Sequence, residues 1–199
     1  MLNGQSVELD RTYMSGDSEI SFEMLKFYIG KIQFFKNEEP VNEIFDSFRL
    51  IDFSDSVPQN SIFEIPVDLD FHKIQFQLGI DSATHQLGIM GGDLDPTKGM
   101  YWAWNTGYIN LKIEGFSSLS SARDKSFQYH LGGYMQPFET VQTIRLDIPK
   151  TSKSILKIDV SKFLSAKYLA AESRTMSPGA KAKELSKVVS TIFYFDEQK

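Results

Sequence analysis

The stretch MGGDLDPTKGMYWAWNTGYINLKIEG, residues 90–115, differs most from the rest of the chain and governs the interpretation of the sequence. It contains both tryptophans, a Gly-Gly pair and two aspartates in an Asp-x-Asp-Pro turn. Tryptophan is large and glycine loses the most backbone entropy on folding, so this choice of residues is costly. Its last part, Tyr108–Glu114, alternates in polarity, which predicts a β-strand with Ile109, Leu111 and Ile113 on one face.

The same period of two recurs on both sides of this stretch and indicates a protein built mainly from strands. Further strands are predicted at residues 5–14, 20–35, 48–53, 62–67, 71–80, 127–131, 141–148 and 155–160. The longest of them is expected to break near Gly30, and Pro58 is expected in a loop. The long connection after Ile80, which runs to Gly99, has no clear periodicity, and its glycines and the following tryptophans favour an ordered segment.

Helical patterns are confined to the last fifth of the chain. A short helix is predicted at residues 161–170, and a stronger one at residues 180–190, where Leu185, Val188 and Val189 form an apolar stripe. No repeat or linker divides the chain. The sequence therefore predicts a mainly β protein: one antiparallel β-sandwich domain of about nine or ten strands over residues 1–199, with a short C-terminal helix.

Composition excludes several classes of function. Lys and Arg number 21 and Asp and Glu 26, which gives a net charge of −5 and argues against nucleic acid as the partner. Because there is no cysteine, disulfides, thiolate metal sites and cysteine nucleophiles are impossible. No apolar run approaches the roughly 18 residues of a membrane-spanning helix, so an integral membrane protein is not expected. The N-terminal residues do not have the pattern of a signal peptide.

Two histidines flank the tryptophan-rich stretch and are candidate metal ligands. His85 precedes it in the long connection, and His130 follows it at the end of a short predicted strand. Imidazole suits copper, zinc, iron and nickel, and a thioether from Met90 or Met100 would favour Cu(I). The alternative for both histidines is a satisfied structural role, and His72 is expected to be an ordinary strand residue. Both methionines also suit the core.

Three aspartates, Asp81, Asp93 and Asp95, are candidate calcium ligands because hard cations take several oxygen ligands. The EF-hand pattern is absent, since Trp104 stands where its bidentate glutamate would be required. Turn chemistry, in which the carboxylates cap backbone amides, is the alternative. No motif of a hydrolase, zinc protease or nucleotide-binding loop occurs, which predicts a non-catalytic protein.

The aromatic residues of the stretch allow three interpretations. Alternation places Trp102 and Trp104 on one side of an extended segment, with Tyr101 and Tyr108 nearby. They could pack in the core, form a platform that stacks a sugar or a peptide, or stand beside a metal as redox-active neighbours. Composition does not separate these roles.

Several segments together resemble the MbnP-like domain family. The resemblance rests on GDLDPTKGMYWAWNTGYINLKIEG (92–115), QLGIDS (77–82) and FQYHLGGY (127–134), and more weakly on residues 25–35, 48–53 and 175–193. The family includes periplasmic partners of methanobactin and copper-repressible surface proteins. The resemblance implies a secreted or periplasmic, all-β protein.

In the family's copper proteins, histidines bind the metal together with kynurenine made by oxidising a tryptophan. The resemblance implies that His130 matches the histidine of the H-L-G element, that His85 corresponds to a loop histidine, and that Trp102 or Trp104 is the candidate for oxidation. A histidine that some members carry before T-M-S-P-G is replaced here by Glu172-Ser173-Arg174.

We therefore expect an exported, non-catalytic copper-binding protein with His85 and His130 as ligands. The alternatives are an exported module whose aromatic side chains bind a glycan or protein partner, and a purely structural β-domain.

Overall fold

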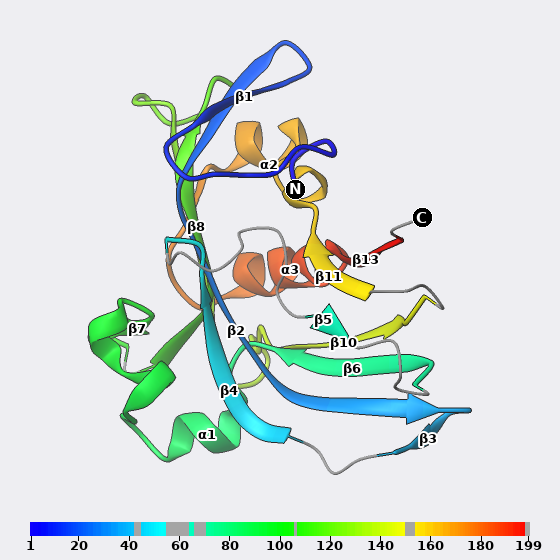
Figure 1. The fold of residues 1–199 in the computed structure, drawn as a ribbon. Coiled ribbons are helices and arrows are strands. Elements are labelled where there is room, and N and C mark those ends of the chain that lie inside the picture. The colour runs from blue at the N-terminus through cyan, green and yellow to red at the C-terminus, as the bar shows by residue number, and fades with distance from the viewer. Residues whose placement is uncertain (42–44, 55–63, 66–70, 106, 150–153, 198–199) are drawn as a thin grey trace.

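The longest strand, β2 (Ser18–Lys36), runs through both halves of a curled sheet (Figure 1). The structure is a computed structural model and describes residues 1–41, 45–54, 64–65, 71–105, 107–149 and 154–197. In it, a ten-stranded sheet has the order β10-β6-β2-β8-β9-β12, with β1, β3 and β4 also paired to β2 and β7 paired to β8. A second sheet has the order β13-β11-β5.

The elements follow the chain from a β-rich first half to a mixed second half. The other strands are β1 (Thr12–Ser15), β3 (Glu39–Pro40), β4 (Phe45–Asp52), β5 (Glu64–Ile65), β6 (Lys73–Leu78), β7 (Tyr101–Trp102), β8 (Gly107–Ser117), β9 (Ser126–Gly132), β10 (Gln142–Asp147), β11 (Ser154–Ile158), β12 (Arg174–Thr175) and β13 (Phe193–Glu197). The helices are α1 (Ser82–Gln86), α2 (Ala166–Ala171) and α3 (Ala180–Val189), with short 3-10 turns η1 (Gly92–Leu94), η2 (Pro96–Lys98) and η3 (Val160–Lys162).

β2 changes partners halfway along its length. Its first half pairs with β8 and its second half pairs with β6 along the same edge, both antiparallel. The predicted break near Gly30 is a bulge within one strand, where the register shifts and Lys31 adopts a positive φ of 50°. A bulge bends a strand without ending it, and this bend helps the sheet to curl.

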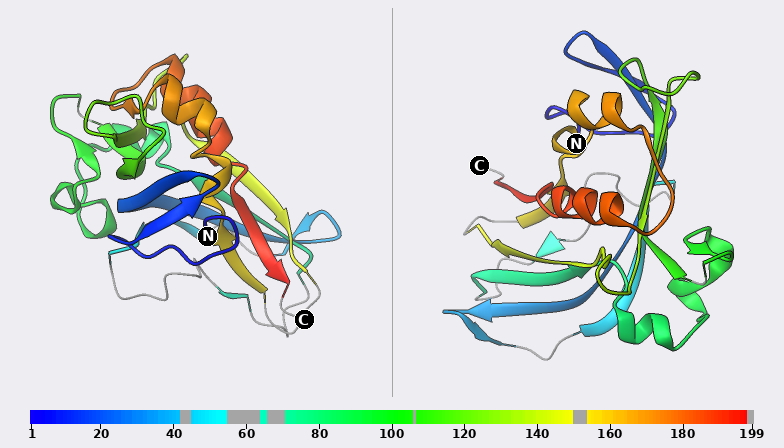
Figure 2. Two further views of the ribbon diagram at one scale, coloured as in Figure 1. Left: turned by 90° about the horizontal axis from the view of Figure 1, so that it is seen from above. Right: turned by 180° about the vertical axis from the view of Figure 1, so that it is seen from behind.

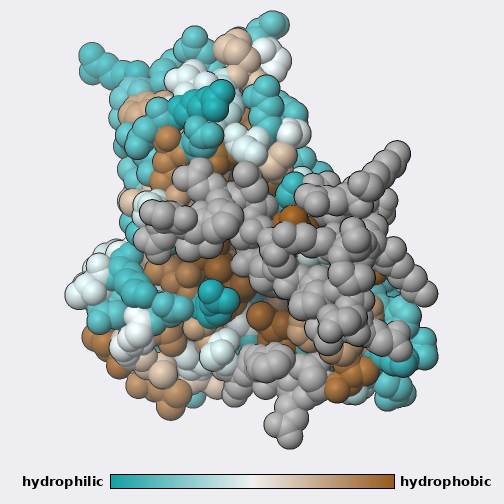
Figure 3. Space-filling view, in the orientation of Figure 1, coloured by the Kyte–Doolittle hydropathy of each residue, from teal (hydrophilic) through white to brown (hydrophobic). Residues whose placement is uncertain are grey.

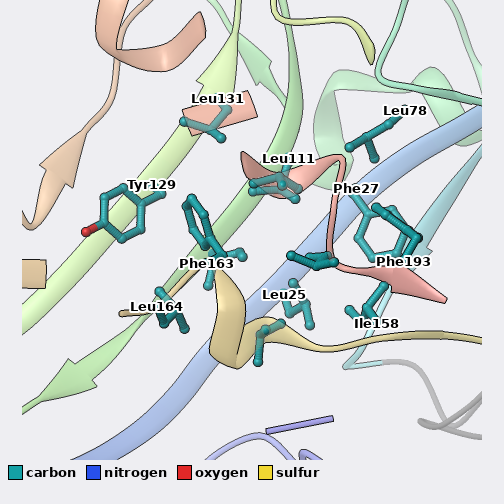
Figure 4. Packing of buried hydrophobic residues seen from close by; sticks show 14 of the residues in the cluster. Leu25, Phe27, Leu78, Leu111, Tyr129, Leu131, Ile158, Phe163, Leu164 and Phe193 are labelled. Carbon is teal, nitrogen blue, oxygen red and sulfur yellow. The ribbon is translucent and has the colours of Figure 1, made fainter. Parts of the chain in front are cut away.

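The main core fills the concave side of the curled sheet. Apolar side chains of β2, β6, β8 and β9 face those of α2, α3 and the second sheet, as the packing around Phe27, Tyr129, Phe163 and Phe193 illustrates (Figure 4). Helices α2 and α3 lie on this side, whereas α1 and β7 lie on the opposite side of the sheet (Figures 1 and 2). The described residues thus form a two-sheet β-sandwich with α2 and α3 on the core side and α1 on the outer side.

A second, smaller cluster lies on the outer face of the sheet. It contains Tyr28, Ile80, Leu94, Met100, Trp102, Tyr108 and Ile109. Strand alternation explains how β2 serves both clusters, since Phe27 and Ile29 belong to the core and Tyr28, between them, to the outer cluster.

The mainly β fold and the C-terminal helix are confirmed. One face assignment was wrong: Ile109 belongs to the outer cluster rather than to the face of Leu111 and Ile113, because the β8–β9 register shifts between Ile109 and Leu111. One pairing departs from the antiparallel pattern, since β12 runs parallel to β9. Of the strand predicted at residues 62–67, the structure describes Glu64–Ile65, and Pro58 lies outside the described residues.

Within the described ranges, no helix combines the length and the apolar character needed to cross a membrane.

Candidate functional site

Residues 81–105, here called the excursion, leave the sheet after β6 and return to it through β7. The departure point is fixed by the buried Asn110, whose Oδ1 accepts the Ile80 N–H at 2.9 Å and whose Nδ2 donates to Thr140 Oγ1 at 2.9 Å. Gly79 has a φ of 92°, and a Cβ there would lie 2.5 Å from Asn110 Cγ. Glycine is required here by both its backbone conformation and the close approach.

The first turn of the excursion is α1, and Asp81 forms its N-cap. Asp81 Oδ1 accepts the Thr84 N–H at 2.7 Å, and its Oδ2 lies 2.6 Å from Lys31 Nζ on β2. Burial raises the pKa of Asp81, but the bonds from Lys31 and Thr84 outweigh burial and hold the pKa below its usual value. Asp81 therefore joins the excursion to the main sheet as a carboxylate.

The other two candidate calcium ligands also hold the chain in place. Asp93 Oδ2 accepts the Leu50 N–H of β4 at 3.2 Å, and its Oδ1 lies 2.8 Å from Lys98 Nζ. Asp95 caps η2 by accepting the Thr97 N–H at 2.8 Å. Asp81 and Asp95 thus have the capping role that was the alternative to calcium, whereas Asp93 binds a backbone amide of a neighbouring strand. Calcium binding stays a prediction.

His85 is buried between two tyrosines at the end of α1. Its ring stacks on Tyr134 with centroids 4.3 Å apart and 13° between planes, and it meets Tyr108 edge to face at 5.2 Å. The Tyr108 N–H donates to its Nδ1 at 3.3 Å, while the buried Nε2 has no hydrogen-bond partner among the described residues. Burial lowers the pKa of His85 to about 4, against opposing effects of Asp81 and the Ile80 carbonyl, so the ring is neutral at pH 7.

His130 lies farther along the outer face, in a charged setting. Its Nε2 is 2.7 Å from Glu114 Oε1, and Lys112 Nζ lies 3.5 Å from the same oxygen. Burial lowers the pKa of His130, and the hydrogen bond that the Glu114 carboxylate accepts from the ring opposes that shift. His130 thus belongs to a partly buried group of three charged or polar side chains on β8 and β9.

The described contacts keep the two histidines apart. His85 meets the backbone of Tyr108, whereas His130 pairs in register with Lys112 and points its Nε2 at Glu114, farther from Tyr108. Tyr108 and Lys112 are four residues apart on β8, which separates the two positions by about 10–13 Å, allowing for the bulge. Nitrogens on one metal ion must lie within about 4 Å of each other, because each bond is about 2 Å long. The arrangement does not fit one ion held by both imidazoles, and a two-histidine copper site stays a prediction.

Among the described residues, no group of three or more histidine, aspartate or glutamate side chains is placed to hold a metal ion.

The two tryptophans contact each other but differ in exposure. Their ring centroids are 5.7 Å apart, yet Trp102 is 6% exposed and Trp104 is 66% exposed. Trp102 covers Gly132 of β9, where a Cβ would lie 2.6 Å from the indole Cζ3. Met100, a candidate thioether ligand, is fully buried in the outer cluster with Trp102. Trp102 and Met100 are therefore packing residues, and Trp104 faces solvent from the turn after β7.

Exposed apolar side chains gather around this excursion. Of the ten large hydrophobic residues that are exposed in the described chain, six lie on the excursion or on the loop after β9, which it contacts through the His85–Tyr134 stack. These six, here called the Trp104 surface, are Leu87, Ile89, Met90, Trp104, Met135 and Phe138. Figure 3 shows apolar atoms gathered at the lower left, over the region of α1 and the connection to β7.

A small pocket lies within this surface. Its volume is about 120 Å³, and its lining residues are Asn105, Gly133, Tyr134, Met135, Gln136, Phe138 and Pro178. We call it the Tyr134 pocket. Tyr134 is the last residue of the motif FQYHLGGY, but the sequence predicted neither Tyr134 nor Phe138 as a site residue. No local pattern marks a loop residue as a pocket wall, because the pocket arises only when three distant segments meet.

A sequence model of the MbnP family matches residues 1–178, nearly nine-tenths of the chain. The chain therefore belongs to the MbnP family, as the tryptophan-rich stretch indicated. A search of curated protein sequences gives no match. Among solved structures, the fold is similar to that of MbnP from Methylosinus trichosporium, with a TM-score of 0.53, 13% identity, and coverage of 90% of this chain and 78% of that chain.

Proposed function

We propose that this protein is an exported, non-catalytic binding protein whose binding site is the Trp104 surface. The observation that carries the proposal is that six of the ten exposed large hydrophobic residues in the described part of the chain lie on the excursion and the adjoining loop. Exposed apolar residues scattered singly need no explanation, but their concentration in one region is typical of an interaction site. Export is proposed from the family resemblance.

An apolar dye tests whether this surface receives a ligand. We expect the fluorescence of 8-anilinonaphthalene sulfonate to rise on adding the folded protein, and to fall at least twofold when Trp104→Ala and Phe138→Ala are combined. Phe116→Ala is the matched control, because Phe116 and Phe138 are both 42% exposed and Phe116 lies elsewhere, on β8. No dye response, or an equal fall in the control, would overturn the proposal.

Copper binding is the second candidate function, and His85 is the residue that favours it. A neutral, buried imidazole with an unpartnered Nε2 can act as a ligand without first losing a proton at pH 7. Its Nδ1 accepts a backbone N–H, however, which places the ring proton on Nε2. Before Nε2 could bind a metal, the ring would need to turn over, or its proton would need to move to Nδ1 with loss of the hydrogen bond from Tyr108. We therefore propose copper only as a second candidate, with His85 or His130 binding it at separate positions.

Copper titration of the folded protein with purified variants tests this candidate. His85→Phe preserves a flat ring against Tyr134, His130→Ala removes the second imidazole, and His72→Ala is the control. The proposal predicts tight binding to the wild type that is lost in at least one of the first two variants and kept in the control. Absence of tight binding, or equal stoichiometry in all four proteins, would refute it.

A further inference from the structure

We infer that the Tyr134 pocket binds one ring of an uncharged saccharide, with the rest of the glycan lying across the Trp104 surface. This inference rests on the proposed binding function and names the chemical class of its ligand. It is argued from the size of the pocket, its chemistry and its rigidity.

The size of the pocket suits one ring of a longer ligand. Pockets that enclose a drug-sized molecule measure about 300–1,000 Å³. The Tyr134 pocket measures about 120 Å³, so it holds only a ring-sized group. Asn105, one of the lining residues, directly follows Trp104 in the chain, whose indole is 66% exposed. A ligand that extends from the pocket past Asn105 would therefore have an exposed indole within its reach.

The lining chemistry matches a group that is apolar on its faces and polar at its edge. Tyr134 and Phe138 supply aromatic rings, whose electron-rich faces attract the weakly positive C–H groups of a sugar ring. Asn105 and Gln136 supply carboxamides, which can donate to and accept from hydroxyl groups. No lining residue is charged, so an ionic ligand would lose its hydration without a counter-charge.

Unused hydrogen-bonding capacity distinguishes a sugar from a plain apolar group. The side-chain amide of Asn105 has no hydrogen bond to the described part of the chain, and the Gln136 Nε2 is engaged by Glu139 while its carbonyl oxygen remains an acceptor. A purely hydrocarbon side chain of a protein partner would cover these amides and leave them unpaired, which is unfavourable. Ring hydroxyls would satisfy them.

The pocket walls are held rigidly before any ligand arrives. Tyr134 stacks on the buried His85, and the turn that follows is closed by Phe138 N–H to Met135 O at 2.9 Å and Thr140 N–H to Gly133 O at 3.0 Å. Lys183 Nζ of α3 also donates to the Pro137 carbonyl. A wall that is already ordered loses little entropy on binding, so a weakly attractive neutral sugar can bind there.

Isothermal titration with a panel of β-1,4-linked pentasaccharides of glucose, xylose, mannose and galactose tests the inference. We expect at least one to bind, with a tenfold or greater loss of affinity in Phe138→Ala and in Asn105→Ala and an unchanged affinity in Phe116→Ala. Binding that is equal in all variants would overturn the inference. If no pentasaccharide binds while the dye response of the Trp104 surface persists, the ligand class is wrong and the binding function stands. If the dye response is also absent, both proposals fail.

Discussion

Trp102 and Trp104 are separated by one residue, yet their side chains have different consequences for the molecule. Trp102 lies over Gly132 and within the outer cluster, so its side chain fills buried space. The Trp104 indole lies tilted against that of Trp102 and faces solvent. The residue type is the same at both positions, so only the difference in burial distinguishes their structural roles.

Replacing each tryptophan by alanine should therefore give unequal losses of stability. We expect Trp102→Ala to lower the free energy of unfolding by about 3–5 kcal/mol, because a large buried side chain leaves a cavity. Trp104→Ala should change it by about 0.5 kcal/mol or less, as is usual at the surface. Urea unfolding followed by circular dichroism measures both values, and equal losses would contradict the packing described here.

His85 should make stability depend on pH in a defined window. Its pKa is lowered from 6.5 to about 4 in the folded protein, so between these values the unfolded chain binds a proton that the folded chain does not. Stability from this residue is complete above about pH 6.5 and falls as the pH drops towards 4, by at most about 3 kcal/mol. His85→Phe, which keeps a ring on Tyr134, should flatten this part of the urea-unfolding profile. An unchanged profile would contradict a lowered pKa, because His85 would then bind its proton equally in the folded and unfolded states.

Among the elements, α1 is too short to be stable by itself and depends on its cap. A helix of five residues gains little from its own hydrogen bonds, so its position rests on Asp81, which also pairs with Lys31 of β2. This contact begins the excursion, and the bond from Leu50 N–H to Asp93 fastens it again at β4. Together with the pairing of β7 with β8, these contacts attach the excursion to three strands of the sheet.

Asp81→Ala should weaken this attachment by about 1–2 kcal/mol, because it removes both the cap and the ion pair with Lys31. Asp81→Asn retains a capping oxygen and should lose less. Asp95→Ala, which removes only the exposed cap of η2, is the control and should cost less than Asp81→Ala. Thermal unfolding of the three variants checks this order, and a larger loss in the control would contradict it.

The elements were largely predictable from the sequence, whereas their outer packing was not. Alternation located β8, β9, β10 and β11 and the stripe of α3 because one face of each is buried. Alternation also predicts which residues share a face, but a bulge reverses it, as Ile109 illustrates. Residues 81–105 have no period, so their placement on the outer face follows from Asn110, Asp81 and Asp93, whose partners are distant in sequence. For the same reason the Tyr134 pocket was not predicted.

At the scale of the whole molecule, one sheet separates two apolar clusters of unequal size. The main core gathers strands, helices and the second sheet, whereas the outer cluster packs the excursion against β2, β4 and β8. Beside this apolar packing, hydrogen bonds of the Tyr28 and Tyr108 hydroxyls and the ion pair of Asp81 with Lys31 hold the excursion. Because the outer cluster is much smaller than the main core, we expect it to open at a lower free energy than the main core.

Hydrogen exchange should reveal this difference. We expect backbone amides of residues 87–99 to exchange with a smaller free energy of opening than those of β2, β8 and β9, because the latter are paired on the central sheet. Exchange measured by mass spectrometry over seconds to hours gives the ranking. Equal protection of both regions would mean that the excursion opens only with global unfolding.

The partner change along β2 also has a consequence for the order in which the chain can assemble during synthesis. β2 is complete at residue 36, but β6 follows only at residues 73–78 and β8 at residues 107–117. During synthesis, β1 and β4 can pair with β2 early, because they lie at residues 12–15 and 45–52. The edge of β2 that receives β8 and β6 stays open for roughly eighty residues more, and an open strand edge can pair with other chains. We therefore expect this edge to be where the nascent protein is most prone to aggregate, because non-local pairing is slow.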